Sequence, residues 1–415
     1  MKKLPFSKND VTALIEKHGL KTPFHLFDET GMRETTREFL DAFSWAPDFK
    51  EYFAVKGNPA PKVLKVLKDE GCGADCSSLP ELVIAEKVGL KGDDIMFTSN
   101  NTPIAEYKKA LELGAIINLD DITHIDYILN GGLKLPEMLS LRYNPGPKRA
   151  GNAIIGDPVN AKYGFTGDQL IEGYKRLKEL GVKKFGLHTM VASNELNADY
   201  IKETAAMLFD MVLEIKEKTE VEIGLVNLGG GIGVAYRPEQ TAMDIRKLGA
   251  DIKKLYDGKI IAKGLRLNLL AFECARVITG PHGYLIMRAI HRKDTYKNYI
   301  GVDANMSDFM RPGVYGAYHH ITVLGKEDAQ PAHTYDIVGS LCENCDKFAT
   351  DRFLPEIEIG DLLVLHDTGA HGAAMGFQYN GKLRAAQYLW NRETGAVTLV
   401  KKPDTLEDYL SQFEF

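Results

Sequence analysis

Lys56 stands at the end of a short apolar run, directly before a predicted turn. In "YFAVKGNPAP" (52–61), aromatic and aliphatic residues precede the lysine and Gly-Asn-Pro follows it. Such residues favour a buried strand and then a turn. A desolvated lysine amine can lose its proton and attack an aldehyde. A lysine at the end of a strand can also be a solvated surface residue, so its position leaves both alternatives open.

A glycine run stands in a comparable place farther along the chain. In "LGGGIG" (228–233), Gly229, Gly230 and Gly231 follow a predicted strand, and their backbone N–H groups could converge on an anion such as a phosphate. The run lacks the full patterns of a P-loop and of a dinucleotide-binding loop. A turn that needs glycine only for tight packing is the alternative.

Two further stretches contain groups that could do chemistry. "LLAFECAR" (269–276) ends a predicted strand with Glu273 and Arg276. These two could form a structural ion pair, or they could instead bind a protonated pyridine nitrogen and a substrate carboxylate. "CENCD" (342–346) could be a metal or redox pair. No second Cys or His pair has zinc-ligand spacing, so the sequence predicts no metal site and favours buried cysteines.

The elements that must position these residues alternate regularly. Short apolar runs alternate with stretches that have apolar residues at helical spacing, which predicts parallel strands joined by crossover helices. Eight such units in roughly 240 residues match the size of a (β/α)8 barrel. A doubly wound open sheet is the alternative, and the count of eight favours the barrel. The predicted strands are 52–56, 73–77, 94–99, 115–120, 138–144, 183–190, 223–230 and 265–273.

The pattern changes after about residue 275. β-rich runs separated by Gly, Pro, Asp and Asn predict an antiparallel β domain, which the strand-like residues 24–29 could join. We therefore expect a barrel domain over 31–275 and a β-rich domain made of 1–30 and 276–415.

The bulk composition limits the possible functions. The chain has 415 residues, 26% of them charged, and a net charge of -6, which gives no reason to expect nucleic acid or an anionic membrane as a partner. No apolar run reaches membrane-spanning length, and the first residues do not resemble a secretory signal. Five cysteines, an odd number, fit reduced thiols in the cytoplasm better than disulfides.

Together, the motifs resemble those of the fold-type III pyridoxal-phosphate decarboxylases, and most closely the diaminopimelate decarboxylases. "YFAVKGN" resembles that family's "YAVKAN", and "GADCSSLPEL" (73–82) resembles "DVASGGEL". "DFMRPGVYGAYHHI" (308–321) is similar to "RPALYGAYH". "GSLCENCDKFATDRFLPEIEIGDLL" (339–363) is similar to "GPICESGDVLAKDRELPEVEPGDLL". The last two matches are long, and they stand in the family's order.

The resemblance implies pyridoxal 5'-phosphate as cofactor and assigns it a site. Lys56 would be the catalytic lysine that holds the cofactor as a Schiff base, and Glu273 would keep the pyridine nitrogen protonated. The other residues implied to bind the cofactor are Asp75, Ser193, Gly229, Gly230, Gly231 and His371.

The resemblance also implies a substrate site shared between two subunits of a homodimer. Arg276, Arg311 and Tyr315 would bind the carboxylate at the far end of the substrate. Cys342 and Glu343 would enter from the partner subunit, Cys342 as the proton donor and Glu343 facing the distal amine.

The chain departs from the family at two positions. In "GLHTMVAS" (186–193), His188 matches the first histidine of the family's "HxHIGS", but Met190 replaces the histidine that stacks on the cofactor ring, and Ala192 replaces glycine. In "GAHG" (369–372), His371 replaces the tyrosine that contacts the phosphate. Methionine can pack on a ring but cannot titrate, whereas histidine can still donate to phosphate.

The implied reaction is decarboxylation of meso-diaminopimelate to L-lysine. Decarboxylation of a related amino acid, such as another carboxylated diamine, is the alternative that the two departures favour. A racemase of this barrel type would place an arginine on the pyridine nitrogen, where this chain has Glu273. A homologue that binds the cofactor without catalysis and acts through a partner is the alternative from another class.

Overall fold

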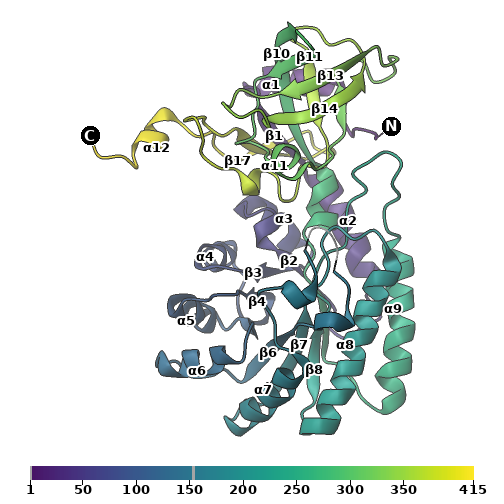
Figure 1. Ribbon diagram of the computed structural model, residues 1–415, viewed down its shortest axis with the longest axis vertical. Helices are drawn as coiled ribbons and strands as arrows, with labels where there is room; N and C mark the ends of the chain where they lie inside the picture. Colours follow the sequence, from purple (N-terminus) through teal and green to yellow (C-terminus); the bar gives the residue numbers. More distant parts are fainter. Residues whose placement is uncertain (1, 152–154) are drawn as a thin grey trace. The chain divides into compact units, whose positions relative to one another are not determined.

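The computed structural model describes residues 2–151 and 155–415. The chain forms two compact units (Figure 1). Unit 1 comprises Met1–Met32, Ala235–Thr241 and Ile278–Phe415, and unit 2 comprises Arg33–Val234 and Ala242–Val277.

Unit 2 contains a closed barrel of eight parallel strands, surrounded by helices (Figure 1). The prediction of a (β/α)8 barrel is confirmed, and the open-sheet alternative is wrong because β9 pairs with β2 and closes the sheet. The barrel strands are β2 (Lys50–Ala54), β3 (Gly73–Cys76), β4 (Ile95–Thr98), β5 (Ile116–Leu119), β6 (Met138–Tyr143), β7 (Lys184–Thr189), β8 (Ile223–Asn227) and β9 (Leu269–Phe272). The helices of this region are α2 (Glu29–Ala42), α3 (Pro61–Asp69), α4 (Leu79–Val88), α5 (Ile104–Leu113), α6 (Thr123–Asn130), α7 (Gly167–Glu179), α8 (Ala198–Thr219), α9 (Ile245–Lys259) and α10 (Arg276–Thr279).

Helix α3 illustrates why the sequence forms these layers. Pro61 occupies its first position, where a missing N–H costs nothing. Val63, Leu64 and Leu67 are buried on one face, as the helical spacing predicts. Buried apolar side chains from five barrel strands form a core cluster, namely Tyr52, Met96, Ile116, Leu225 and Ala271.

Each predicted strand extends beyond the carboxyl end of the observed one, and all but the first are also longer than the observed strand. Strand β2 ends at Ala54, and Val55–Gly57 form a 3-10 turn, so Lys56 projects from a turn and not from the strand itself. Strand β8 likewise ends at Asn227, before the glycine run. These turns are also largely buried, so the apolar pattern continues past the end of each strand. Side-chain periodicity therefore does not show where the strand ends.

Unit 1 contains a nine-stranded sheet in which most pairs are antiparallel. The predicted antiparallel β domain is confirmed as a mostly antiparallel sheet, in which two pairs, β1 with β16 and β11 with β13, are parallel. The strands are β1 (Phe24–Asp28), β10 (Gly283–Asp294), β11 (Asn298–Val302), β12 (Ile321–Val323), β13 (His333–Val338), β14 (Lys347–Leu354), β15 (Leu362–Leu365), β16 (Ala386–Trp390) and β17 (Val397–Lys401). The helices are α1 (Lys8–His18), α11 (Arg311–Tyr315) and α12 (Leu406–Leu410). Over the described residues, none of the helices has the length and apolar character needed to cross a bilayer.

Candidate active site

Lys56 and Asp75 meet at the carboxyl ends of β2 and β3. The Nζ atom of Lys56 lies 3.3 Å from Oδ2 of Asp75. The Lys56 side chain is half exposed (50%), whereas Asp75 is fully buried. The structure therefore places an accessible amine over a buried carboxylate at the mouth of the barrel, where enzymes of this architecture do their chemistry.

The electrostatics of this pair are set by burial and by nearby carboxylates. Desolvation lowers the pKa of the Lys56 ammonium, but Asp75 and Glu273 oppose this effect and the net shift is upward. Burial and the charge of Glu273 raise the pKa of Asp75, although Lys56 lowers it. In this state Lys56 is a protonated cation that Asp75 stabilises.

Glu273 directly follows β9 and is held by two side chains from neighbouring strands. His188 on β7 donates from Nε2 to Oε2 of Glu273 at 3.0 Å, and Asn227 on β8 donates from Nδ2 to Oε1 at 2.7 Å. Burial alone would raise the pKa of Glu273, but His188 and Lys56 bring it below its usual value. Burial lowers the pKa of His188. The barrel mouth thus contains an ionised carboxylate with a fixed orientation.

The glycine run lies between the ends of β7 and β9. Gly229 has a positive φ of 72°, and a Cβ there would collide with the carbonyl oxygen of Thr189. A Cβ on Gly230 would collide with the carbonyl oxygen of Glu273. These positions require glycine because other backbone segments approach them closely. Packing, the plainer alternative, therefore explains part of the run.

Ser193 lies beside the glycine run. Glu195 N–H donates to the carbonyl oxygen of Gly231 at 2.8 Å, and Gly233 N–H donates back to Glu195 at 2.9 Å. A Cβ on Gly231 would also meet Ala192. The residues on both sides of Ser193 are thereby fixed against the glycine run.

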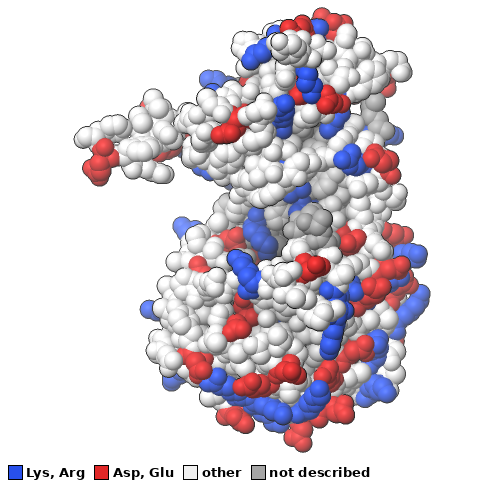
Figure 2. All heavy atoms as spheres, in the orientation of Figure 1, with Lys and Arg blue, Asp and Glu red and all other residues white. Residues whose placement is uncertain are grey.

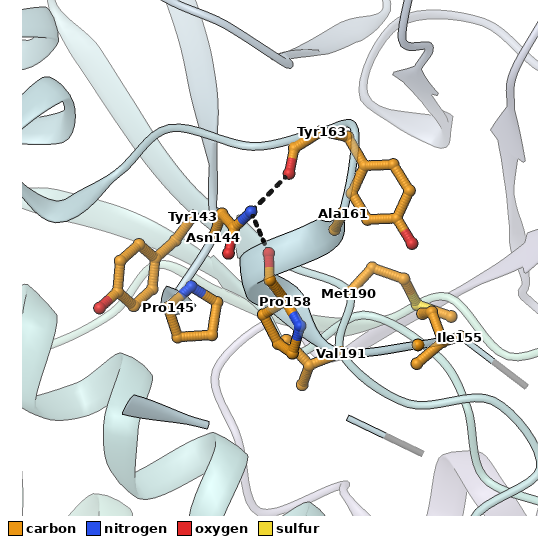
Figure 3. Close-up of a pocket in the computed structure, with 10 residues that line it drawn as sticks. Tyr143, Asn144, Pro145, Ile155, Pro158, Ala161, Tyr163, Met190 and Val191 are labelled. Carbon is orange, nitrogen blue, oxygen red and sulfur yellow. Dashed lines mark hydrogen bonds between the residues drawn. The ribbon is translucent and has the colours of Figure 1, made fainter. Parts of the chain in front are cut away.

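Met190 touches the same run. The N–H of Gly230 donates to Sδ of Met190 at 3.3 Å, a weak hydrogen bond to sulfur. Met190 also lines a small pocket together with Tyr143, Ile155 and Tyr163, and its sulfur lies next to Ile155 (Figure 3). The pocket has a volume of about 10 Å3, close to that of one water molecule. Met190 therefore connects the glycine run to the chain that follows β6.

Sequence reasoning missed several polar side chains inside the barrel. Arg142 on β6 donates from Nη1 to Asp120 at 3.3 Å, and its guanidinium lies 3.9 Å from the ring centroid of Tyr163. Asn227, which holds Glu273, was also not predicted. Arg142 and Asn227 could have been found from the sequence, because each is a polar residue close to the carboxyl end of an otherwise apolar strand. In a barrel, residues at that end of the strands form the active site.

Arg276 and Arg311 are both buried, the former in unit 2 and the latter in unit 1. Nε of Arg311 donates to Nε2 of His319 at 3.3 Å, and Nδ1 of His319 donates to the carbonyl oxygen of His366 at 2.9 Å. His319 is therefore a neutral imidazole with a defined tautomer. The Arg311 guanidinium also lies 5.4 Å from the ring centroid of Tyr236, which sequence reasoning did not identify.

The other predicted residues of unit 1 are more exposed. Tyr315, at the end of α11, is 59% exposed. Cys342 and Glu343 lie in an exposed turn, where Cys342 N–H donates to Asn380 Oδ1 at 2.7 Å and Glu343 accepts from the Tyr379 hydroxyl at 3.0 Å. His371 has a left-handed φ of 51°. The structure brings Lys56, Asp75, Ser193, Gly229, Gly230, Gly231 and Glu273 together within unit 2, whereas Arg311, Tyr315, Cys342, Glu343 and His371 belong to unit 1.

Comparisons with known proteins agree over nearly the whole chain. Residues 30–280 match the family model described as "Pyridoxal-dependent decarboxylase, pyridoxal binding domain". The chain is 38% identical to Protein TabA of Pseudomonas amygdali pv. tabaci, covering 95% of this chain and 91% of that protein. It is 33% identical to diaminopimelate decarboxylase of Methanothermobacter thermautotrophicus, covering 97% of this chain and 93% of that protein.

A solved structure has the same fold. The structure of diaminopimelate decarboxylase from Methanocaldococcus jannaschii in complex with L-lysine is similar, with a TM-score of 0.89 and 27% identity. The similarity covers 98% of this chain and 94% of that chain.

Proposed function

This chain belongs to the pyridoxal-dependent decarboxylases, and we propose that it converts meso-diaminopimelate to L-lysine. It is a pyridoxal-phosphate-dependent carboxy-lyase of the diaminopimelate decarboxylase type. The observation that carries the proposal is the arrangement of Lys56, Asp75 and Glu273 at the barrel mouth, because an amine and two carboxylates there suit this cofactor.

The described residues fit pyridoxal phosphate. The glycine run forms a cradle of backbone into which no Cβ would fit at Gly229 or Gly230. Oδ1 of Asp75 and Nδ1 of His188 are buried, and neither has a hydrogen-bond partner among residues 2–151 and 155–415. Buried polar atoms normally find partners, so a polar ligand at this mouth would complete the site.

The cofactor supplies a conjugated ring that spreads the charge left on Cα when carbon dioxide departs. Lys56 would hold the cofactor covalently, and Ser193, His371 and the glycine run would bind its phosphate. Glu273, whose pKa is lowered by His188 and whose carboxylate is oriented by His188 and Asn227, would hold a proton on the ring nitrogen.

We assign two arginines to the binding of the substrate's far end. Arg276 and Arg311 would bind the carboxylate that is retained, and Tyr315 would add a neutral hydrogen bond. A bidentate arginine contact to a carboxylate is strong and directional. The carboxylate that is lost should stay away from such cations, since stabilising it in the ground state raises the barrier. In this proposal the barrel domain (31–275) binds the cofactor, and the β-rich domain (1–30 and 276–415) contributes Arg311 and Tyr315.

A second subunit would complete the site. Cys342 and Glu343 lie in an exposed turn of unit 1, accessible to another copy of the chain. Cys342 would donate the proton to Cα, and Glu343 would bind the distal amine. We place the homodimer in the cytoplasm, because all five cysteines are free thiols, which fits a reducing compartment.

One alternative substrate is another carboxylated diamine. Met190 and His371 stand where the resemblance predicts histidine and tyrosine, and the identity to Protein TabA exceeds that to the Methanothermobacter enzyme. A changed ring contact and a changed phosphate contact would suit a substrate of different shape.

The test is to incubate the protein with meso-diaminopimelate carrying 13C in both carboxyl groups. We expect one equivalent of 13CO2 and L-lysine that retains the second label. Arg311→Ala should lower kcat/KM for this substrate about 100-fold or more, and Arg311→Lys, which keeps the charge, should lower it less. If the protein releases CO2 from another carboxylated diamine but not from diaminopimelate, that diamine is its substrate and diaminopimelate is not. No CO2 from any amino acid would contradict the proposal.

A further inference from the structure

The ring of Tyr318 lies between two guanidinium groups in unit 1. The Cζ atoms of Arg352 and Arg237 lie 4.1 Å and 4.6 Å from the ring centroid. Arg352 also donates from Nη1 to the carbonyl oxygen of His319 at 3.0 Å. Burial lowers the pKa of Arg352, and the charge of Arg237 adds to this effect. Within the described part of the chain, neither guanidinium forms an ion pair with a carboxylate. Two positive charges therefore stand together, and neither is paired directly with a carboxylate of the described residues.

These residues line a cavity of about 640 Å3, which we call the Tyr318 cavity. Its wall contains Arg237, Tyr318, Lys347 and Arg352, one carboxylate, Asp351, which pairs with Lys297 at 2.7 Å, and apolar residues that include Pro312 and Ala317. Lys347 is already paired with Asp336 at 2.9 Å, so the guanidiniums are the unpaired cations. A volume of this size accommodates several side chains, and its charge selects an acidic occupant.

A segment of matching character projects from unit 1. Residues 406–415, which include α12, we call the α12 segment. Its base is anchored by Asp404, which accepts from Arg384 Nε at 2.6 Å and from Lys401 Nζ at 2.9 Å. Burial alone would raise the pKa of Asp404, but these donors lower it to about 2. Thr405 caps α12 in a capping box with Asp408. The helix is therefore preformed and attached at its base.

The side chains of the α12 segment face solvent. Leu406 is 57% exposed and Phe413 is 54% exposed. Glu407, Asp408 and Glu414 give the segment three carboxylates, and it contains no lysine or arginine. Figure 2 shows it as a projection with acidic side chains on an otherwise uncharged surface. The α12 segment thus has a capped helix and an anchored base, and it exposes the side chains of Leu406 and Phe413. Exposed apolar side chains of this kind are expected to be covered by a partner.

We propose that the α12 segment of one copy docks into the Tyr318 cavity of a second copy. Its carboxylates would pair with Arg237 and Arg352, and Phe413 would pack against Pro312 and Ala317 on the wall of the cavity. Within unit 1, α12 stands well apart from β14, which carries Arg352 (Figure 1). The occupant is therefore assigned to a second copy and not to the same chain. This contact adds to the proposed homodimer and does not depend on the proposed reaction.

Sedimentation of the full chain over a range of concentrations tests the docking. Deletion of residues 406–415, and Arg237→Gln with Arg352→Gln, should each raise the dimer dissociation constant at least about 30-fold. The deletion and the double substitution combined should do little more than either alone. Arg237→Gln by itself keeps the test valid if Arg352→Gln fails to fold. Tyr296→Ser and Arg266→Gln, which change exposed residues of similar kind elsewhere, should leave association unchanged.

A labelled peptide of residues 402–415 gives an independent readout. It should bind the truncated protein saturably, and the Arg237→Gln and Arg352→Gln substitutions should abolish this binding. The same peptide with glutamine at its three acidic positions within 406–415 should bind at least about 30-fold more weakly. A dimer whose dissociation constant is unchanged by the deletion would overturn the proposal, even if the peptide binds, since the segment would then fold onto its own chain. Binding of inorganic phosphate without binding of the peptide, or a protein that is monomeric at every concentration, would also overturn it.

Discussion

The Nε2 atom of His188 lies 3.0 Å from Oε2 of Glu273, and both side chains are buried at the mouth of the barrel. A buried carboxylate is costly unless it is paired and hydrogen-bonded. His188 and Asn227 together satisfy both oxygens of Glu273. Burial would raise the pKa of Glu273, but His188, Lys56 and Arg142 lower it below its usual value. Glu273 can therefore serve as a fixed negative charge for a cationic ring nitrogen.

Replacement of Glu273 by glutamine should remove that charge while preserving shape. We expect cofactor content to change little and kcat for CO2 release to fall at least about 100-fold, which corresponds to about 3 kcal/mol of transition-state stabilisation. Glu51→Gln is the matched control, because Glu51 is also a fully buried carboxyl group, which accepts from Cys274 N–H at 2.6 Å, and burial raises its pKa well above the usual value. Equal losses in both variants would contradict the role of Glu273.

Replacement of Asp75 by asparagine should change the pH dependence of cofactor binding. Asp75 raises the pKa of Lys56, so its removal lowers that pKa and leaves more neutral amine at a given pH. The absorbance of the cofactor-free protein changes as it forms the covalent bond to added cofactor. The pH at which the rate of this change increases should therefore be lower for Asp75→Asn than for the native protein. Stopped-flow absorbance between pH 6 and pH 10 measures this. A shift toward higher pH would show that Asp75 does not set the Lys56 pKa.

Substitution of Met190 tests the residue that replaces the expected histidine. Met190→His introduces an imidazole beside the Gly230 N–H, and imidazoles titrate between about pH 5 and 8. The absorbance of the bound cofactor should then depend on pH in that window, whereas native protein and Met190→Leu should not show this titration. If all three proteins show the same titration, it comes from a group other than the side chain at position 190.

Mixing of inactive variants tests the shared active site. Lys56→Ala and Cys342→Ala should each be inactive alone, and free subunit exchange should restore about one quarter of native activity. Half of the dimers would be mixed, and each of these would have one intact site. Lys56→Ala mixed with Glu273→Gln is the control, because both changes lie in unit 2 and no mixed dimer would have an intact site. Recovery in the control, or none in the test mixture despite proven exchange, would refute the shared site.

Much of the barrel could be predicted because its signal is local. Alternating apolar runs and helical stretches, as in β2 and α3, follow from side-chain periodicity within a few residues. Lys56 and Glu273 stood out for the same reason, since each interrupts an apolar run at its carboxyl end. Their partners His188 and Asn227 lie 85 and 46 residues from Glu273 in sequence. Such pairs depend on which strands become neighbours and in what register, and local side-chain periodicity does not reveal either.

The sheet of unit 1 shows the same limit. Strands β1 and β16 pair in parallel although they lie at opposite ends of the chain. An alternating apolar pattern predicts that a strand is half-buried, but it does not give the direction of its neighbour. The sequence therefore predicted the antiparallel β domain as a whole, but not the two parallel pairs within it, β1 with β16 and β11 with β13.

Borohydride reduction followed by peptide mapping tests the central claim most directly. Reduction of the protein with its cofactor should fix a phosphopyridoxyl group to the peptide that contains Lys56, and mass spectrometry of the digest should find the added mass on that residue. Lys56→Arg, which keeps the charge at the same place, should carry no such adduct. An adduct on any other lysine of the native protein, or a reducible adduct that persists in Lys56→Arg, would contradict the account of the site.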